Sequence, residues 1–595
     1  MEGVKANLES TFEASIVEHL TDHGGWSSGD ATEYDRLLGM CPHELIRFVE
    51  ATQPDVWAKL VGMQGGLSQA TDKFTKYVAS EVSARGLVDV LRRGVKTMGT
   101  SVKIAFFAPA HDLTPELREL AEANRLSVTR QVHHSESNPQ DSVDLTLFLN
   151  GLPVATAELK TQFTSQDMDD AVAQYRYARN PNDLIFKERT VVHFAVDQDT
   201  VAMTTKLAGK STRFLPFNQG SAGPGRDGGK GNPPNAKGPR SAYLWETVWQ
   251  RDNWLNILGS YVHVATDKWT DEAGKAHKSK TTIFPRYHQW DSVEKLLAAA
   301  KVDGPGTNKL IQHSAGSGKS NSIAWLAHGL SRLHTPNDVK LLDRHAVASG
   351  LGANEPVFDK VIIVTDRVVL DRQLQSTVTG FDHTPGMIET IDKHKTSEDL
   401  RGALEGKKAR IIVTTLQKFP VVAQAATALS GSRFAVIADE AHSSQTGEAV
   451  KDLKAVLSGK TGDDALQAAE LADGESEAAG GDIEDALVAS AQTRGKQSNL
   501  TFFAFTATPK SKTLEMFGEL ITDPAGDERY VAFHLYSMRQ AIEEGFILDV
   551  LANYTTYKTY YRLANGLGGD DPVLPKGKAA SALARRAGPV LARRA

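Results

Sequence analysis

Three charged side chains on two neighbouring strand-like segments have the types and spacing suited to cutting a phosphodiester bond. Asp144 begins the run VDLTLFL, and the run VATAELK carries Glu158 and Lys160, which share one strand face because side chains alternate across a sheet. Phosphodiester cleavage needs carboxylates to hold Mg²⁺ and a cation near the attacking water or the developing charge. The sequence therefore predicts a nuclease site in which Asp144 and Glu158 bind Mg²⁺ and Lys160 supplies the cation.

The hairpin that joins these two runs must have a particular register for this prediction to hold. Asn150-Gly151 is a good signal for a tight turn. A plain two-residue turn would place Asp144 opposite Ala157, leaving Asp144 and Glu158 on opposite faces of the sheet, where one metal ion cannot bridge them. A three-residue turn or a compensating β-bulge would instead bring the two carboxylates together, with Gly151 at a positive φ. We expect one of these two irregularities.

A second kind of phosphate chemistry is indicated by His313–Ser320, HSAGSGKS, which follows the apolar run NKLIQ and precedes the helical pattern SIAWLAHGL. Glycines let backbone N–H groups turn inward around phosphate, and the start of the helix adds the positive end of its dipole. Lys319 is expected to reach the β- and γ-phosphates of ATP, and Ser320 to offer its hydroxyl to Mg²⁺. His313 stands where the strict form of the motif has glycine. The nucleotide-binding residues expected here are His313, Gly316, Ser317, Gly318, Lys319 and Ser320.

The expected partner of this loop is Asp439-Glu440-Ala441-His442, at the end of the apolar run FAVIA. A carboxylate at the carboxyl end of a strand can hold the Mg²⁺ shell, which is the role expected of Asp439. Glu440 is then placed to polarise the attacking water, and His442 completes the predicted nucleotide site. The four residues alone are a weak signal, but their place on a separate strand after a phosphate loop makes the combination strong.

Further polar segments resemble the motifs of a superfamily-2 helicase motor, and they occur in the same order. Thr-Ala-Thr after LTFFAF resembles the motif that couples the ATP state to the nucleic acid, and the segments after KVIIV and ARIIV resemble motifs that contact DNA. In FPRYHQ, Gln289 resembles the glutamine that reads adenine through its amide. Taken singly, each threonine or glutamine is more often a cap or a surface residue. The predicted DNA-coupling residues are Thr365, Arg367, Thr415, Gln417, Thr506 and Thr508.

These side chains must be positioned by three regions of an α/β chain. Residues 1–260 form a mixed α/β region ending in the Gly/Pro-rich stretch 221–240, which predicts a loop, more plausibly flexible than phosphate-binding. Residues 261–525 alternate short apolar runs with helical patterns, which is typical of a parallel sheet with chemistry at the carboxyl ends of its strands. The acidic segment 461–487 is expected to be a surface insertion. Residues 526–595 end in a low-complexity tail containing LARRA twice.

Composition places the chain among soluble proteins of several domains. The 595 residues are 41% hydrophobic and 24% charged, and no stretch approaches the ~18 apolar residues of a membrane span. The polar N-terminus is not a signal peptide, and the single cysteine excludes a disulfide framework, so a cytoplasmic location is expected. The net charge of −6 counts weakly against a DNA partner, because a local basic channel can lie on an acidic body.

The spacing of Asp144, Glu158 and Lys160 resembles the PD-(D/E)xK nuclease fold, in which Gln174 and Tyr177 would match the Gln…Tyr element of RecB-like members. Over about residues 1–560 the chain resembles the restriction (R) subunit of type I restriction-modification enzymes. The resemblance lies in the sequence and the order of its motifs: the nuclease residues, FPRYHQ, HSAGSGKS, DEAH and TATP. This resemblance implies a PD-(D/E)xK domain at 1–260, a RecA-like motor lobe at 261–525 and the start of a second lobe at 526–595. It also implies ATP and Mg²⁺, double-stranded DNA, methylase and specificity subunits, and S-adenosylmethionine bound elsewhere in the assembled complex.

Members of that family continue for several hundred residues with a second RecA-like lobe, whose arginines complete the ATP site, and no such motif follows residue 560. We therefore expect a truncated subunit that binds ATP, hydrolyses it poorly alone and does not translocate. Two other readings remain open at this point. One is a helicase-nuclease of DNA repair or of another defence system, and the other is a truncated, non-catalytic relic that binds DNA and ATP.

Overall fold

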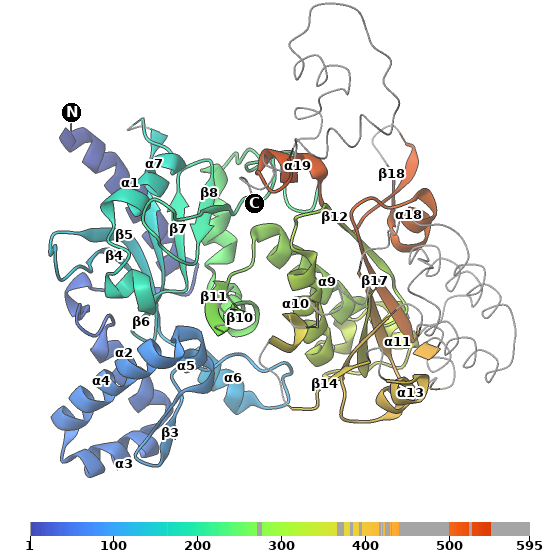
Figure 1. Ribbon diagram of the computed structural model, residues 1–595, viewed down its shortest axis with the longest axis horizontal. Coiled ribbons are helices and arrows are strands. Elements are labelled where there is room, and N and C mark those ends of the chain that lie inside the picture. Colours follow the sequence, from blue (N-terminus) through green and yellow to red (C-terminus); the bar gives the residue numbers. More distant parts are fainter. Residues whose placement is uncertain are drawn as a thin grey trace, which may run out of the picture. The chain divides into compact units, whose positions relative to one another are not determined.

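The structure, a computed structural model, describes residues 2–162, 165–270, 276–365, 374–375, 377–380, 385–391, 395–415, 418, 421–422, 429, 431–439, 499–522 and 526–548. Residues 1–547 form one compact unit (Figure 1). The acidic insertion at 461–487 and both copies of LARRA lie outside the described residues. In the part of the chain that is described, no helix is long and apolar enough to cross a membrane.

The first region is built on a seven-stranded mixed sheet in the order β1-β4-β5-β6-β7-β8-β9. β4, β5 and β6 are antiparallel neighbours, and β6 and β7 run parallel. All eight residues of β6 are buried, so both faces of the central sheet are covered. The strands are β1 (Ser27–Ser28), β4 (Leu126–His133), β5 (Ser142–Leu149), β6 (Leu152–Leu159), β7 (Val192–Val196), β8 (Val201–Thr204) and β9 (Leu215–Pro216).

Helix α1 (Glu2–Asp22) packs on β4 and β6 of this sheet. Phe12, Ile16 and Leu20, four residues apart, are buried together, so one face of α1 is anchored in the core. Glu13, next to Phe12, is buried on the same side. The other elements of the region are α2 (Pro42–Thr52), α3 (Pro54–Gln64), α4 (Leu67–Arg85), α5 (Leu87–Arg93), β2 (Val95–Thr97), β3 (Thr100–Val102), α6 (Pro115–Glu122), α7 (Met168–Ala173) and α8 (Arg251–Asn256). The antiparallel pair β10 (His263–Thr270) and β11 (Ala276–Ile283) follows at the start of the second region.

The second region is built on a seven-stranded parallel sheet in the order β14-β15-β13-β16-β17-β12-β20, which confirms the predicted parallel sheet. Alternate residues of β13 pack into two different core clusters, so both faces of the sheet are buried. A strand buried on both faces reads as a continuous apolar run, as KVIIV does. The strands are β12 (Lys309–His313), β13 (Lys360–Thr365), β14 (Ile388–Thr390), β15 (Ile411–Thr415), β16 (Phe434–Ala438), β17 (Leu500–Thr506) and β20 (His534–Tyr536).

Helices α9 (Tyr287–Asp303) and α10 (Lys319–Arg332) pack on each other, and α10 lies against β13, β15 and β16 (Figure 1). Strand β20, from the range assigned to the third region, pairs in parallel with β12 as the last strand of this sheet. The remaining described elements are α11 (Arg344–Ala348), α13 (Ser397–Glu405), α18 (Ser511–Phe517), β18 (Glu519–Thr522), β19 (Glu528–Val531) and α19 (Met538–Glu543).

The Gly/Pro-rich stretch 221–240 is a loop with turns, and part of it packs against β20 and α19. Leu535 N–H donates to the carbonyl of Gly225 at 3.0 Å, and Ser537 Oγ donates to that of Gly228 at 2.7 Å. Lys230 N–H donates to Glu543 Oε2 at 2.8 Å. The expected loop is thus confirmed, and its glycines allow a close backbone approach to the segment that follows the second sheet.

Candidate functional site

The hairpin that carries the predicted nuclease residues turns through two residues. Asn150 and Gly151 have φ values of 52° and 80°, and Leu149 pairs with Leu152 across them. Two central residues at positive φ make the tight turn that fits the twist of antiparallel strands. By itself this turn would place the two predicted metal ligands on opposite faces.

A β-bulge compensates for the short turn. The pairing shifts by one residue between Leu147 and Phe148, and beyond the shift Leu145 pairs with Ala157. Continued by one position, this register sets Asp144 level with Glu158. The backbone N–H of Leu159 donates to Asp144 Oδ2 at 2.8 Å, which holds the Asp144 carboxylate at β6. The predicted bulge and the positive φ of Gly151 are therefore confirmed.

The Glu158 carboxylate is completely buried beside a cation that the sequence did not indicate. Arg179 Nε donates to Glu158 Oε1 at 2.6 Å, and Arg179 Nη2 donates to the carbonyl of Ser142 at 2.6 Å. Glu158 Oε2 is buried without a hydrogen-bond partner. Burial, with the nearby charge of Asp144, raises the pKa of Glu158 well above its usual range. An acceptor left unpaired in a buried site is the feature expected of a carboxylate that binds a cation.

Helix α1 adds two further carboxylates to this site. Lys160 Nζ lies 3.3 Å from Glu9 Oε1. One helical turn later Glu13 is buried, and it accepts from Arg130 Nε at 3.0 Å. Burial, followed by the charge of Asp144, raises the pKa of Glu13. Sequence reasoning missed Glu13 because it lies 131 positions before Asp144, and the only available signal was the i, i+4 spacing of two glutamates on one helix.

The segment after α7 differs from the predicted Gln…Tyr element. Gln174–Ala178 forms a π-helical turn, closed by the hydrogen bond from Arg179 N–H to the Gln174 carbonyl at 3.1 Å. Tyr177 is 66% exposed, whereas Tyr175 is buried and shares a 2.9 Å hydrogen bond with Thr156 Oγ1. The wider turn changes which side chains share a face, so Tyr175 is the tyrosine that faces the sheet, and the assignment of Tyr177 stays a prediction. The assignment of Gln174 stays a prediction.

The residues at this site fit a Mg²⁺ ion. Asp144, Glu158 and Glu13 supply the hard oxygen donors that Mg²⁺ prefers, and Glu158 Oε2 has no competing partner. No described residues form a preset cage of three or more His, Cys, Asp or Glu ligands. Mg²⁺ does not require one, because it keeps several waters and is bound through one or two carboxylates together with substrate phosphates.

The predicted phosphate loop joins β12 to α10. Gly316 and Gly318 have φ values of 72° and 76°, which only glycine adopts readily, and α10 begins at Lys319. Lys319 Nζ lies 3.4 Å from the His313 carbonyl. A glycine-containing turn therefore leads directly into the start of a 14-residue helix, which is the arrangement that binds nucleotide phosphates.

Gln289 lies against the phosphate loop. Its Nε2 donates to the carbonyls of Ser317 and Gly318 at 3.0 and 3.1 Å, and its Oε1 accepts from the backbone N–H of Arg286 at 2.9 Å. A contact between Gln289 and adenine stays a prediction. It would require the Gln289 amide to replace one of these hydrogen bonds with a bond to the base. The same element gives the loop a second link, because Arg286 Nη2 donates to the carbonyl of Gly316 at 2.9 Å.

The other motor residues lie at the ends of neighbouring strands. Thr365 ends β13, Thr415 ends β15 and Thr506 ends β17, while Asp439 follows β16 and Thr508 follows β17. In a parallel sheet these ends share one edge with the phosphate loop after β12, so the predicted set is brought together. The other predicted residues in this group, Arg367, Gln417, Glu440 and His442, lie outside the described residues.

A buried row of three polar side chains underlies the phosphate loop. His534 Nε2 donates to Asp291 Oδ2 at 2.9 Å, because a carboxylate only accepts. His534 Nδ1 must then accept from His313 Nε2, also at 2.9 Å, which leaves His313 Nδ1 as a buried acceptor without a partner. Burial lowers the pKa of both histidines, so both rings are neutral. The strand β20 is thereby linked to the first residue of the loop.

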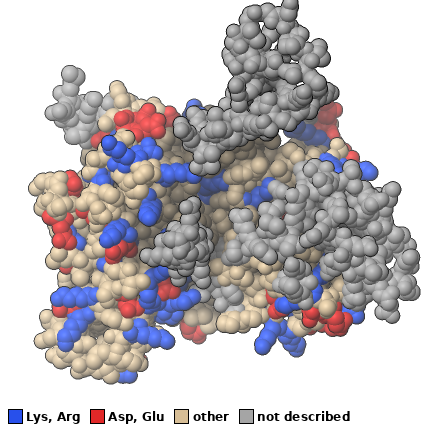
Figure 2. All heavy atoms as spheres, in the orientation of Figure 1, with Lys and Arg blue, Asp and Glu red and all other residues tan. Residues whose placement is uncertain are grey.

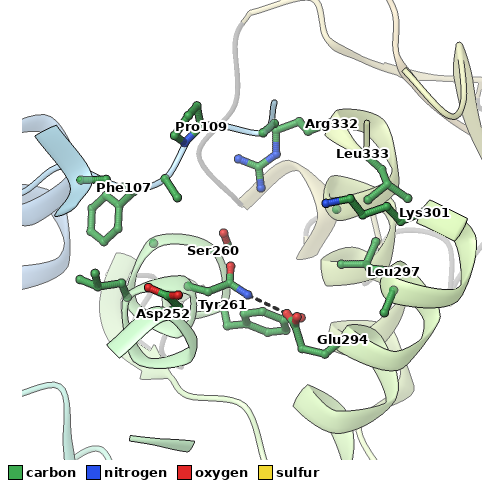
Figure 3. A pocket seen from close by; sticks show the side chains of 18 of the residues that line it. Phe107, Pro109, Asp252, Ser260, Tyr261, Glu294, Leu297, Lys301, Arg332 and Leu333 are labelled. Atoms are coloured by element: carbon green, nitrogen blue, oxygen red, sulfur yellow. Dashed lines mark hydrogen bonds between the residues drawn. The ribbon is translucent and has the colours of Figure 1, made fainter. Parts of the chain in front are cut away.

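A cavity of about 560 Å³ lies at the far end of α10 from the phosphate loop. Figure 3 shows Arg332 and Lys301 projecting toward it from α10 and α9, and Asn256 Nδ2 donates to Glu294 Oε1 on its floor at 2.7 Å. On α10 the cavity is lined by Trp325, Gly329 and Arg332, and at about 1.5 Å per residue the first of these lies roughly 9 Å along the helix from Lys319. The cavity is therefore separate from both predicted sites. On the described face in Figure 2, basic and acidic side chains are interspersed.

Two family models match the chain. Residues 9–212, which contain the bulged hairpin, match the N terminus of type I restriction enzyme R proteins. Residues 288–462, which contain the phosphate loop, match the SWI2/SNF2 ATPase. The two predicted chemistries thus fall in two matched regions, in the predicted order.

Curated relatives agree with these models at low identity. A type I restriction enzyme endonuclease subunit from Staphylococcus saprophyticus is 22% identical over 55% of this chain and 30% of its own length. Another such subunit, from Staphylococcus aureus strain COL, is 23% identical over 73% of this chain and 37% of its own length. The chain therefore spans about a third of the curated relatives that it matches. A solved fragment of a proposed HsdR subunit from Vibrio vulnificus YJ016 is 14% identical, with a TM-score of 0.23 over 70% of this chain and 56% of that one.

Proposed function

We propose that this chain supplies the ATP-dependent motor and the endonuclease of a type I restriction enzyme, because residues 9–212 match the N terminus of type I restriction enzyme R proteins and residues 288–462 match the SWI2/SNF2 ATPase. Its substrate would be unmodified double-stranded DNA, and its partners would be methylase and specificity subunits. ATP and Mg²⁺ would bind this chain, whereas S-adenosylmethionine would bind elsewhere in the complex. The observation that carries the proposal is the bulged register, which places Asp144 level with Glu158 within the matched region.

The nuclease residues divide the work by charge and burial. Asp144 and Glu158 would hold Mg²⁺, with Glu13 as a third carboxylate. Bound Mg²⁺ would polarise the scissile phosphate and make a coordinated water more acidic. Lys160, 8% exposed, would supply positive charge near the developing negative charge. Arg179 keeps the Glu158 side chain in place at 2.6 Å.

The motor residues act at the edge of the parallel sheet. Backbone N–H groups of the phosphate loop would bind the β- and γ-phosphates, with Lys319 as the neutralising cation. Ser320 and Asp439 would hold the Mg²⁺ that accompanies ATP, and Glu440 would polarise the attacking water. The threonines at the ends of β13, β15 and β17 would transmit conformational changes at the nucleotide site to the bound DNA.

The test uses the chain with its methylase and specificity subunits, an unmodified circular plasmid, ATP and Mg²⁺. Lys160→Ala should abolish cleavage and leave ATP hydrolysis intact, whereas Lys319→Ala should abolish both. Lys187→Ala, with a side chain 58% exposed in the same domain, is the matched control and should cut like the wild type. Cleavage by Lys160→Ala at the wild-type rate would refute the assigned nuclease site, and unchanged hydrolysis by Lys319→Ala would refute the motor assignment.

A further inference from the structure

One residue of β4 has a backbone conformation that a strand does not favour. Gln131 has a φ of 51°, in the left-handed region that non-glycine residues rarely adopt. The antiparallel pairing of β4 with β5 keeps one register on both sides, from Arg130 with Leu145 to Val132 with Val143. The regular pairing is interrupted only where Gln131 stands opposite Asp144. The distortion is therefore local and coincides with a predicted metal ligand.

The side chain of Gln131 joins the carboxylates of this site. Its Nε2 donates to Glu13 Oε1 at 3.0 Å and lies 3.3 Å from Asp144 Oδ1. Its Oε1 accepts from Ser142 Oγ at 2.6 Å, which fixes the orientation of the amide. One –NH₂ group thus bridges two carboxylates that repel each other, as the raised pKa of Glu13 reflects after the effect of burial.

We propose that Gln131 is a positioning residue that holds Glu13 and Asp144 together as a preorganised pair of cation ligands, and that the left-handed backbone of β4 is retained for this purpose. Backbone strain persists only where its surroundings enforce it, and it concentrates at functional sites. The buried, unpartnered Glu158 Oε2 is independent evidence that a cation binds here. The inference rests on the proposed nuclease function and goes beyond it, because it assigns a role to a residue outside the nuclease motif.

A structural role and a positioning role for Gln131 predict different results. If the amide only stabilises the fold, its removal should lower the melting temperature and leave cation affinity unchanged. If it preorganises the carboxylates, its removal should weaken cation binding. Glycine at this position would also release the left-handed strain. This gain in stability offsets the stability lost with the hydrogen bonds, so the melting temperature should not fall. Partners outside the first shell of a metal typically change its affinity by about 10–100-fold.

The experiment measures Mn²⁺ binding to the full chain by isothermal titration calorimetry, without nucleotide, together with the melting temperature of each metal-free variant. Gln131→Gly and Gln131→Asn should bind Mn²⁺ about tenfold more weakly than the wild type, at an equal or higher melting temperature. Asparagine tolerates the left-handed region but is too short to bridge the carboxylates. Gln131→Asn therefore provides a second test if the glycine variant does not fold. Met98→Gly is the matched control, because Met98 has a φ of 49° in the turn between β2 and β3.

Asp144→Asn distinguishes a failure of the proposed nuclease site from a failure of the proposed role of Gln131. If the wild type binds Mn²⁺ and Asp144→Asn abolishes this binding, the nuclease site is supported. Binding that Asp144→Asn leaves unchanged would refute that site, whatever the Gln131 variants do. Wild-type affinity in Gln131→Gly or Gln131→Asn, alongside sensitivity to Asp144→Asn, would refute the role of Gln131 alone. Met98→Gly should keep wild-type affinity, and weaker binding in that control would also overturn the inference.

Discussion

The row of Asp291, His534 and His313 under the phosphate loop supports a prediction that can be worked out atom by atom. His534→Phe keeps an aromatic ring of similar size and removes both of its hydrogen bonds. The His313 Nε2–H then loses its acceptor, in a side chain that is fully buried. Asp291 loses one donor but keeps Lys295 Nζ at 2.7 Å. The change therefore leaves one buried donor unpaired and one buried carboxylate half-satisfied.

The expected loss follows from these two consequences. An unpaired buried donor costs about 1–3 kcal/mol, and a hydrogen bond to a charged group contributes about 1.5–3 kcal/mol. Their sum predicts that His534→Phe lowers the unfolding free energy by about 2.5–6 kcal/mol. His534→Gln is the control, since one amide can donate to Asp291 and accept from His313, and it should lose less than half of that amount. Because His313 begins the phosphate loop, ATP affinity of the folded His534→Phe protein should also fall.

Urea unfolding followed by circular dichroism measures the stability, and titration with a fluorescent ATP analogue measures the affinity. Both are compared among the wild type, His534→Phe and His534→Gln. A His534→Phe protein within about 0.5 kcal/mol of the wild type would refute the assigned hydrogen bonds, since that is the range of a neutral surface substitution. Equal stability loss in both variants would show that the packing of the His534 ring determines the stability, and that its hydrogen bonds to Asp291 and His313 do not.

Three further predictions concern the first domain, and urea unfolding measures each one. Gly151→Ala should lower the unfolding free energy by at least about 1–2 kcal/mol, because φ is +80° and an added Cβ meets backbone atoms of Cys41 and Leu45 at the start of α2; no loss would contradict the tight turn. Acid should destabilise this domain, since burial lowers the pKa of His193 to about 3: below about pH 6.5 the unfolded chain takes up a proton that the folded chain does not. His193→Gln should therefore reduce the slope of unfolding free energy against pH by up to about 1.4 kcal/mol per pH unit down to pH 3, and an unchanged slope would contradict its neutral state. Arg179→Met should cost about 3–5 kcal/mol by leaving the Glu158 carboxylate buried without its cation, and the cost should shrink as the pH falls, because burial raises the pKa of Glu158 and favours its neutral form; a loss that does not depend on pH would contradict the ion pair.

The parallel sheet could be predicted because its strands are buried on both faces. Each of five short apolar runs became a strand of this sheet, since a strand covered on both faces needs apolar residues at every position. Two edge strands, β14 and β20, have only three residues each, and a run of that length carries no periodic signal. For the same reason the sequence could not show that β20 joins the sheet of the phosphate loop. The five predicted runs are NKLIQ, KVIIV, ARIIV, FAVIA and LTFFAF.

The nuclease hairpin could be predicted to the level of its register because strand faces alternate with a period of two. That rule required an irregularity between Asp144 and Glu158, and a bulge supplies it. The rule says nothing about side chains from other elements, so Glu13 and Arg179 could not be found from spacing. The burial of Tyr175 in place of Tyr177 could not be predicted from an α-helical spacing, because a π-helical turn bonds groups five residues apart.

The glycine-rich stretch 221–240 shows why composition alone cannot separate freedom from close contact. Glycine is used where a chain is unrestrained, and also where another group approaches the backbone too closely for a side chain. A Cβ on Gly225, which has a φ of 72°, would stand 2.8 Å from the ring of His534, and one on Gly220 would stand 2.8 Å from Gln540 Oε1. These glycines therefore serve close approach. The ring of His534 is enclosed by this loop on one side and by His313 of the phosphate loop on another, so the first region contacts the very residue that supports the nucleotide site.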